Sequence, residues 1–330
     1  MFDGKKILIT GGTGSLGQAL TERLLKHDVD TIRIFSRNEH KQISMASKFQ
    51  DDRLRFFIGD IRDYDRLTRA LEDIDIVFHA AALKHVPVIE YNPFEAIKTN
   101  VLGSQNVIDA CLHENVEKAI GIGTDKAVSP LNTYGATKLL MEKLFVTANN
   151  YLNQKRHKTK FIALRYGNVL GSSGSVIPLF ANQIQMKKKI TITDNQMTRF
   201  SITMNEALDF ILESTLIGKG SEIFVPKLRA YSISEVKNAL FDILEKTDEE
   251  IIGIRPGEKL HEILINEDEL KNTFDLDNKY VILKSDIVKT AREIHPTIKD
   301  LDLIKTYSSK NVDKISKEEL KKIILSENIL

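Results

Sequence analysis

Tyr134 and Lys138 are four residues apart, so on a helix their side chains lie on one face. A tyrosine with the ordinary pKa of ~10 acts as a base near pH 7 only if its phenolate is stabilised by roughly 4 kcal/mol. A cation such as that of Lys138 supplies stabilisation of this kind. The pair therefore indicates proton removal from a hydroxyl group, although the same spacing also occurs on exposed helices that have no such role.

A second polar group, Thr124, Asp125 and Lys126, precedes Tyr134 in the sequence. Asp125 can serve as a general acid and Lys126 as a general base only if Asp125 holds a proton and Lys126 is neutral, the reverse of their states in solution. Burial in a closed site favours both uncharged forms. We therefore expect a neutral Lys126 beside a protonated Asp125, the alternative being an ordinary surface ion pair.

Short apolar runs rich in β-branched residues alternate with helical patterns from residue 5 to about residue 165. Most of these runs lack the polar alternation of a sheet with one wet face, so helices are expected on both faces. The pattern predicts an α/β fold with a Rossmann-like, doubly wound parallel sheet in residues 1–166. Residues 167–330 are predicted to form a smaller, interleaved C-terminal substrate domain, with some segments returning to the sheet. The expected strands are residues 6–10, 31–36, 54–58, 74–79, 118–123 and 160–165.

A glycine-rich segment follows the first expected strand and opens a helix. Backbone N–H groups at such a helix N-terminus can hold a pyrophosphate. Gly11 would permit a tight turn, Gly14 would let the backbone approach the phosphates, and Gly17 would let helix and strand pack closely. The segment predicts a dinucleotide site, which makes residues 1–166 the cofactor-binding domain. Its expected contacts are Gly11, Thr13, Gly14, Ser15, Leu16 and Gly17.

The second expected strand ends at Ser36 and Arg37. A basic residue at this place accommodates the 2′-phosphate of NADP, whereas an acidic residue binds the ribose hydroxyl of NAD. Arg37, with Ser36 and Lys41, therefore favours NADP, and NAD remains the alternative because Arg37 can instead pair with a surface acid. Small side chains after the fourth strand would let the backbone lie against the cofactor, unless they only fill the core. These are Ala80, Ala81 and Ala82.

The overall composition argues against several classes of partner. Lys and Arg total 47 against 46 Asp and Glu, and the net charge of +1 favours neither nucleic acid nor an anionic membrane. Cys111 is the single cysteine, so no intramolecular disulfide or multi-cysteine metal site can form, and no metal is expected. The sequence contains no long apolar stretch typical of a signal peptide or a membrane span. A cytoplasmic location is expected by default.

The spacing of Gly11, Gly14 and Gly17 resembles the fingerprint of the short-chain dehydrogenase/reductases. Residues 123–127 and 134–138 resemble more closely the UDP-N-acetylglucosamine 4,6-dehydratases of the pseudaminic-acid and polysaccharide pathways, which belong to the extended branch of that family. The resemblance covers nearly the whole chain, because further segments are similar to the same enzymes. These are residues 84–87, 165–169, 197–200 and 255–259.

This resemblance implies a reaction in three steps on UDP-N-acetylglucosamine. Tyr134, with Lys138 beside it and Thr124 steadying the sugar hydroxyl, takes the C4 hydroxyl proton while hydride passes to NADP. Lys126 then removes the C5 proton as Asp125 protonates the departing C6 hydroxyl, and the hydride returns to C6. The resemblance also implies that Asp60 and Ile61 contact the adenine.

The second half of the chain is expected to recognise the nucleotide-sugar. Arginine forks suit a diphosphate, and an amide or carboxylate can bind sugar hydroxyls, although each such residue could instead form a structural salt bridge. The candidates are Asn168, Arg199, Arg255 and Glu258, and the resemblance adds Lys84 near the sugar-nucleotide.

Resemblance to the inverting enzymes implies that the product is UDP-2-acetamido-2,6-dideoxy-β-L-arabino-hexos-4-ulose. The alternatives are a dehydratase that retains configuration at C5, a UDP-sugar 4-epimerase and a catalytically silent NADP-binding module. An epimerase needs no acid and base for C5 and C6, so Asp125 and Lys126 argue against it. Family members commonly associate through the helices that carry the Tyr-Lys pair, so a homo-oligomer is expected.

Overall fold

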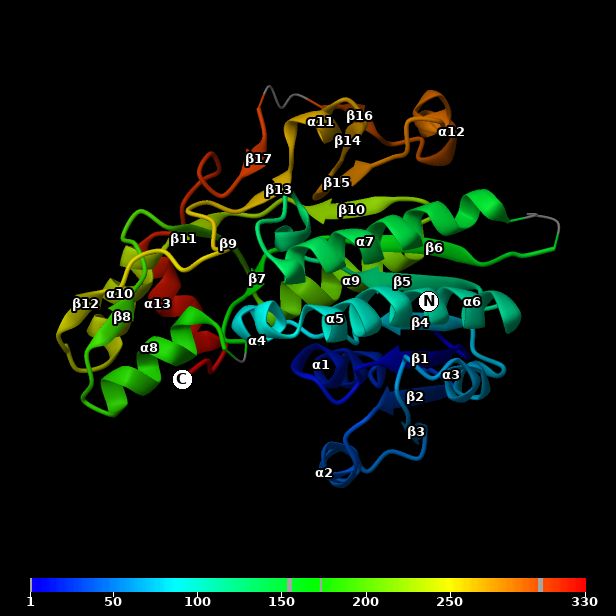
Figure 1. Cartoon of the computed structure of the whole chain (residues 1–330), viewed down its shortest axis with the longest axis horizontal. Helices are drawn as coiled ribbons and strands as arrows, with labels where there is room; N and C mark the ends of the chain where they lie inside the picture. The colour runs from blue at the N-terminus through cyan, green and yellow to red at the C-terminus, as the bar shows by residue number, and fades with distance from the viewer. Residues whose placement is uncertain (1, 153–155, 173, 302–304) are drawn as a thin grey trace.

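A ten-stranded sheet runs through the centre of the computed structural model, which describes residues 2–152, 156–172, 174–301 and 305–330 (Figure 1). The strand order is β16-β14-β15-β10-β6-β5-β4-β1-β2-β3. Neighbours from β3 to β10 pair in parallel, and β15, β14 and β16 add an antiparallel edge. Their bounds are β1 (Lys6–Thr10), β2 (Thr31–Ser36), β3 (Leu54–Ile58), β4 (Ile76–His79), β5 (Lys118–Ile122), β6 (Lys160–Leu164), β10 (Ile223–Pro226), β14 (Thr273–Leu276), β15 (Lys279–Ile282) and β16 (Lys299–Asp300).

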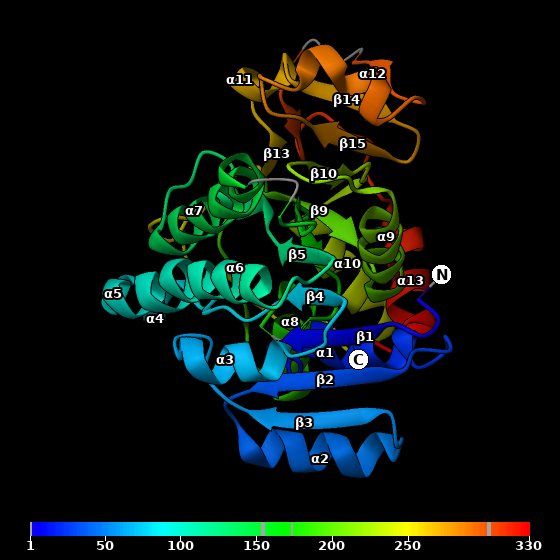
Figure 2. The ribbon, with the colours of Figure 1, turned by 90° about the vertical axis from the view of Figure 1, so that its right-hand side faces the viewer.

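The predicted doubly wound α/β fold is confirmed, because helices cover both faces of this sheet (Figure 2). Within β1, Ile7 and Ile9 face the core on the side of α1 and α9, while Leu8 faces the core under α3, α6 and α7. All three side chains are fully buried, which explains the absence of polar alternation. The covering helices are α1 (Ser15–Leu24), α2 (Glu39–Phe49), α3 (Tyr64–Leu71), α6 (Gly103–His113), α7 (Thr133–Ala148) and α9 (Met204–Ile217).

Three of the six predicted strands have the bounds that the sequence predicts. The fourth begins at Ile76 rather than at residue 74, and the fifth and sixth end one residue early, at Ile122 and Leu164. The short connecting helices are α4 (Val86–Tyr91), α5 (Pro93–Ala96), the π-helix η1 (Ile97–Leu102), η2 (Asp125–Ala127), η3 (Asn149–Tyr151), α11 (Glu267–Leu270), η4 (Val288–Thr290) and α12 (Ala291–Ile294).

The second half of the chain both extends the main sheet and builds a separate apolar core. Strands β10 and β14 to β16 join the main sheet, whereas α8, α10 and α13 enclose a core that includes Ile177, Leu240 and Ile324 (Figure 1). The elements outside the main sheet are β7 (Asn168–Val169), α8 (Val176–Gln185), β8 (Ile190–Ile192), β9 (Thr198–Ile202), β11 (Ala230–Ser232), α10 (Ile233–Ile243), β12 (Glu249–Ile251), β13 (Ile263–Ile265), β17 (Tyr307–Ser308) and α13 (Lys317–Ser326).

A buried arginine fixes α7 to the neighbouring elements. Arg165, just after β6, is fully buried and donates to both carboxylate oxygens of Glu142 on α7, at 2.9 and 2.6 Å. It also donates to both carboxylate oxygens of Glu269 on α11, each at 2.9 Å. Removing one partner of such a group leaves an uncompensated buried charge. The network therefore fixes the position of α7, the helix that carries Tyr134 and Lys138.

Among the described residues, no helix combines the length and the apolar character needed to cross a membrane.

Candidate active site

The glycine-rich segment lies between β1 and α1 and packs against the end of β4. Gly11 has a φ of 68°, and a Cβ there would come within 2.8 Å of the Ala81 Cα. A Cβ on Gly17 would lie 2.5 Å from Gly12, so neither position accepts a side chain without movement. Gly14 carries no side chain that could cap α1, which begins at Ser15. These contacts leave backbone N–H groups of the first turn to an anion, as a pyrophosphate site requires.

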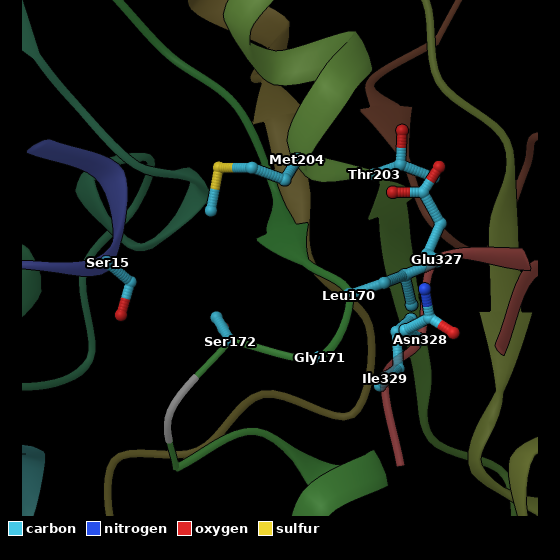
Figure 3. Close-up of a pocket in the computed structure, with 9 residues that line it drawn as sticks. All are labelled: Ser15, Leu170, Gly171, Ser172, Thr203, Met204, Glu327, Asn328 and Ile329. Atoms are coloured by element: carbon cyan, nitrogen blue, oxygen red, sulfur yellow. The ribbon is translucent and has the colours of Figure 1, made fainter. Parts of the chain in front are cut away.

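A small cavity lies beside the start of α1. Figure 3 shows Ser15 on one side of a cavity of about 210 Å³ and residues 327–329 on the other. On the sheet side, the Ala81 backbone N–H donates to the Thr10 hydroxyl at 3.3 Å, and the same hydroxyl contacts His79 at 2.8 Å. Ala80, Ala81 and Ala82 are all half-buried. The backbone of Ala80 and Ala81 lies against Gly11 of the glycine loop.

The residues expected at the adenosine end differ in exposure. Arg37 is exposed, with its guanidinium 3.7 Å from the Asp60 carboxylate, so its acidic neighbour is Asp60. The hydroxyl of Ser36 accepts a hydrogen bond from Gln42 at 3.0 Å, which leaves its own hydrogen to donate. Lys41 is exposed in the first turn of α2. Ile61 is 4% exposed and belongs to the core, so its side chain is covered by protein.

Lys138 contacts the end of β5, and Lys126 lies beside Tyr134. The Lys138 ammonium is buried and donates to the backbone oxygen of Ile122 at 2.6 Å, and burial lowers the pKa of Lys138 to about 8. Burial also raises the pKa of Tyr134, and the groups that oppose this rise are the charge of Lys126 and a hydrogen bond with Thr124. Lys126 is thus a second cation that can stabilise the phenolate, and the role of Lys138 stays a prediction.

Lys126 forms the centre of a polar cluster at the end of β5. Its ammonium donates to Asp125 at 3.0 Å and to Asn168 at 3.2 Å, and it lies 3.5 Å from the Glu262 carboxylate. The Thr124 hydroxyl donates to the same Asp125 oxygen at 2.9 Å. Burial alone would lower the pKa of Lys126, but the charges of Asp125 and Glu262 outweigh it and raise that pKa. Two buried carboxylates thus favour the charged form of the amine, whereas the sequence predicts a neutral amine for the reaction step.

A cavity of about 720 Å³ opens beside this cluster, a volume in the range of small-molecule sites. Arg199 is held by backbone oxygens of Thr198 and Leu260 at 2.9 and 3.3 Å, whereas Arg255 is half-exposed and lies 3.8 Å from Glu258. The cavity brings together all the residues that the sequence predicts for substrate binding, and Lys126 also lines it. These lining residues are Lys84, Lys126, Asn168, Arg199, Arg255 and Glu258.

Residues 7–284 match the family model described as "Polysaccharide biosynthesis protein". The chain belongs to this family.

Several known proteins are similar to this chain over most of its length. A UDP-N-acetylglucosamine 4,6-dehydratase (inverting) from Campylobacter jejuni strain 81-176 is 50% identical over 86% of this chain and 84% of its own. A UDP-glucose 4-epimerase from Rickettsia bellii strain OSU 85-389 is 42% identical over 99% of this chain and 97% of its own. The X-ray structure of Pen from Bacillus thuringiensis superposes with a TM-score of 0.91 and 40% identity, covering 100% of this chain and 99% of that one. The resemblance drawn from the sequence motifs is thereby confirmed at the level of the family.

The sequence analysis did not identify several polar residues of the cavity, among them Glu262, Tyr231 and Lys259. Glu262 is 3% exposed, and Tyr231 is 1% exposed with a pKa that burial raises to about 12. Lys259 donates to the Val128 backbone oxygen, and burial lowers its pKa. A signal was present for Glu262, because a lone acid at this place interrupts the apolar run of residues 260–265 just after the motif at residues 255–259.

Among the described residues, no group of three or more His, Cys, Asp or Glu side chains could hold a metal ion.

The lowered pKa of Lys138 predicts a pH dependence of stability. Its pKa of about 8 in the folded chain lies below the ordinary 10.5, so between these values the unfolded chain binds more protons and stability rises with pH. The free energy of unfolding of the wild type, minus that of Lys138→Met, should increase by roughly 3 kcal/mol across this interval. Urea unfolding of both proteins at several pH values measures the difference. A difference that stays constant with pH would show that Lys138 keeps its ordinary pKa.

Proposed function

We propose that this chain is an NADP-dependent UDP-N-acetylglucosamine 4,6-dehydratase that inverts C5. The observation that carries the proposal is the contact of Asp125 and Lys126 beside Tyr134, at the edge of a cavity large enough for a nucleotide-sugar. The identity to an enzyme named as an inverting dehydratase supports it. On this proposal residues 1–166 bind the cofactor and residues 167–330 mainly bind the UDP-sugar.

The cofactor would lie on the glycine loop and supply the acceptor and later the donor of hydride. Tyr134 takes the C4 hydroxyl proton, with Thr124 and the Lys126 ammonium lowering the cost of its phenolate. Lys138, whose ammonium donates to the Ile122 carbonyl at the end of β5, would also bind the cofactor. Arg199 and Arg255 neutralise the diphosphate, and Asn168 and Glu258 bind hydroxyl groups.

The ion pair of Asp125 and Lys126 must change its charge state before elimination. One proton transfer along the 3.0 Å hydrogen bond, from the Lys126 Nζ to the Asp125 carboxylate, makes the amine neutral and the acid protonated together. The amine then takes the C5 proton while the acid protonates the departing C6 hydroxyl, and the ion pair is restored. The two groups thus reach the predicted acid and base forms by exchange between themselves, rather than by desolvation alone.

A 4-epimerase is the second candidate, because relatives named UDP-glucose 4-epimerase are 42% identical over almost the whole chain. Epimerisation uses Tyr134 and the cofactor but no acid and base at C5 and C6, so it leaves the buried Asp125–Lys126 contact without a chemical role. A dehydratase that retains C5 uses the same groups, and the product alone distinguishes it.

Incubation with UDP-N-acetylglucosamine should give a product lighter by one water, with the L-arabino configuration at C5. Mass spectrometry detects the loss of water, and proton NMR of the fresh product in deuterated water reports the configuration. An unchanged mass with a galacto-configured product would establish the epimerase instead. Loss of water with a D-xylo product would reject inversion while keeping the dehydratase.

Arg37→Ala should weaken NADP binding at least tenfold more than NAD binding, since the lost charge faces only the 2′-phosphate. The exposure of Arg37 and the donor left on Ser36 support this role. Isothermal titration of the two cofactors measures the difference, and Arg66→Ala, on α3, is the matched control. Equal weakening of both cofactors would show that Arg37 serves only its contact with Asp60.

The proposed enzyme is a homo-oligomer that associates through the helix that carries the Tyr-Lys pair, α7, together with α4 and α5. Val88, Tyr91 and Phe94 on α4 and α5 are 61%, 87% and 61% exposed, and both helices contact α7. Exposed apolar side chains grouped in this way are typical of a protein interface.

A further inference from the structure

Glu262 is a buried carboxylate that lacks hydrogen bonds. Its Oε1 lies 3.5 Å from the Lys126 Nζ and 3.6 Å from the Arg199 Nε, beyond the range of a normal hydrogen bond. Its Oε2 is buried and has no hydrogen-bond partner among the described residues. A buried charged group without hydrogen bonds lowers stability, so its contribution to the fold does not explain its presence.

Hydrogen bonds to residues 308 and 309 fix the backbone of Glu262. Its N–H donates to the Ser309 hydroxyl at 2.9 Å, and its carbonyl accepts from the Ser309 N–H at 2.8 Å and the Ser308 hydroxyl at 3.1 Å. The segment is thus fixed to β17 on both sides of the residue. Glu262 lines the cavity and precedes β13, whereas Asp125 lies in η2, so the contact joins two segments distant in sequence.

The ammonium of Lys126 has three oxygen neighbours among the described residues, and each comes from a different part of the chain. Asp125 follows β5, Asn168 begins β7, and Glu262 precedes β13. Asp125 and Asn168 are at hydrogen-bonding distance, so Glu262 acts on Lys126 mainly through charge.

We propose that Glu262 is a positioning residue of the elimination step. It holds Lys126 and Arg199 toward the cavity and stabilises the positive charge that Lys126 acquires when it takes a proton. In that step the C5–H bond breaks, its proton bonds to the Lys126 Nζ, and its electron pair forms the C5–C6 double bond. The C6–O bond breaks with its electrons on oxygen, which takes the proton of Asp125 and leaves as water. This assignment of the step rests on the proposed function, whereas the effect of Glu262 on the charge of Lys126 does not.

The charge effect is tested by acetylation of the chain with acetic anhydride at fixed pH, because only a neutral amine reacts. Glu262→Gln removes the charge at nearly constant side-chain volume. The acetylation rate at Lys126, followed by peptide mass spectrometry, should then rise at least tenfold. Such a rise corresponds to a fall of about one unit in the pKa of Lys126. Glu262→Asp keeps the charge and should stay near the wild-type rate. Glu267→Gln, which removes the same charge at an exposed site of the same segment, should change it less than twofold. Equal acetylation rates in the wild type and in Glu262→Gln would overturn the charge effect. A rise in Glu262→Asp as large as that in Glu262→Gln would also overturn it, because it would show that the substitution loosens the site rather than removes a charge.

The role in elimination has its own readout. Glu262→Gln should lower kcat for loss of water at least tenfold with KM within threefold, because Lys126 loses the carboxylate that holds its amine toward the cavity, and Glu262→Asp should restore most of the rate. An unchanged kcat in Glu262→Gln would overturn this role. If the wild type forms no dehydrated product, the proposed function fails instead, and the acetylation rates still decide whether Glu262 sets the charge of Lys126.

Discussion

The contact between the Lys126 ammonium and two buried carboxylates is the interaction on which the site depends. Asp125 and Glu262 keep the amine charged although burial opposes it, and that charge in turn favours the phenolate of Tyr134. A single cation therefore influences both proposed proton transfers, at C4 and at C5. The cluster gathers Asp125, Asn168 and Glu262 from three places far apart in the chain, so folding must be nearly complete before it exists.

The fold supplies the rigidity that this arrangement needs. Strand β5 of the doubly wound sheet ends beside the cavity, and ligands of such sheets bind at this end of the strands. Arg165, just after β6, fixes α7 to α11. A Cβ on Gly135 would come within 2.2 Å of the Lys126 carbonyl, so the start of α7 packs directly on the segment that carries the acid and base. Tyr134 and Lys126 thus keep fixed positions relative to one another.

The sequence predicted local features well and charge states poorly. The strand bounds and the glycine loop follow from hydrophobic periodicity and from φ requirements, which are properties of neighbouring residues. The charge of Lys126 is influenced by its contact with Glu262, which is distant in sequence. The sequence motif ends at residue 259, so it does not predict this contact. The same limitation applies to the contacts of Lys138. Spacing places Tyr134 and Lys138 on one face of α7, but only the structure shows that the Lys138 ammonium reaches the Ile122 carbonyl.

The central claim is that Tyr134 oxidises C4 while Asp125 and Lys126 carry out a separate elimination. The most direct measurement is the absorbance of reduced nicotinamide bound to the enzyme after UDP-N-acetylglucosamine is added to Asp125→Asn. The account predicts that this absorbance appears and persists, because hydride leaves C4 but water cannot be expelled. In Tyr134→Phe the absorbance should stay absent. A folded, substrate-binding Asp125→Asn protein that shows no reduced cofactor, or that turns over at the wild-type rate, would contradict the division of labour between the two sets of residues.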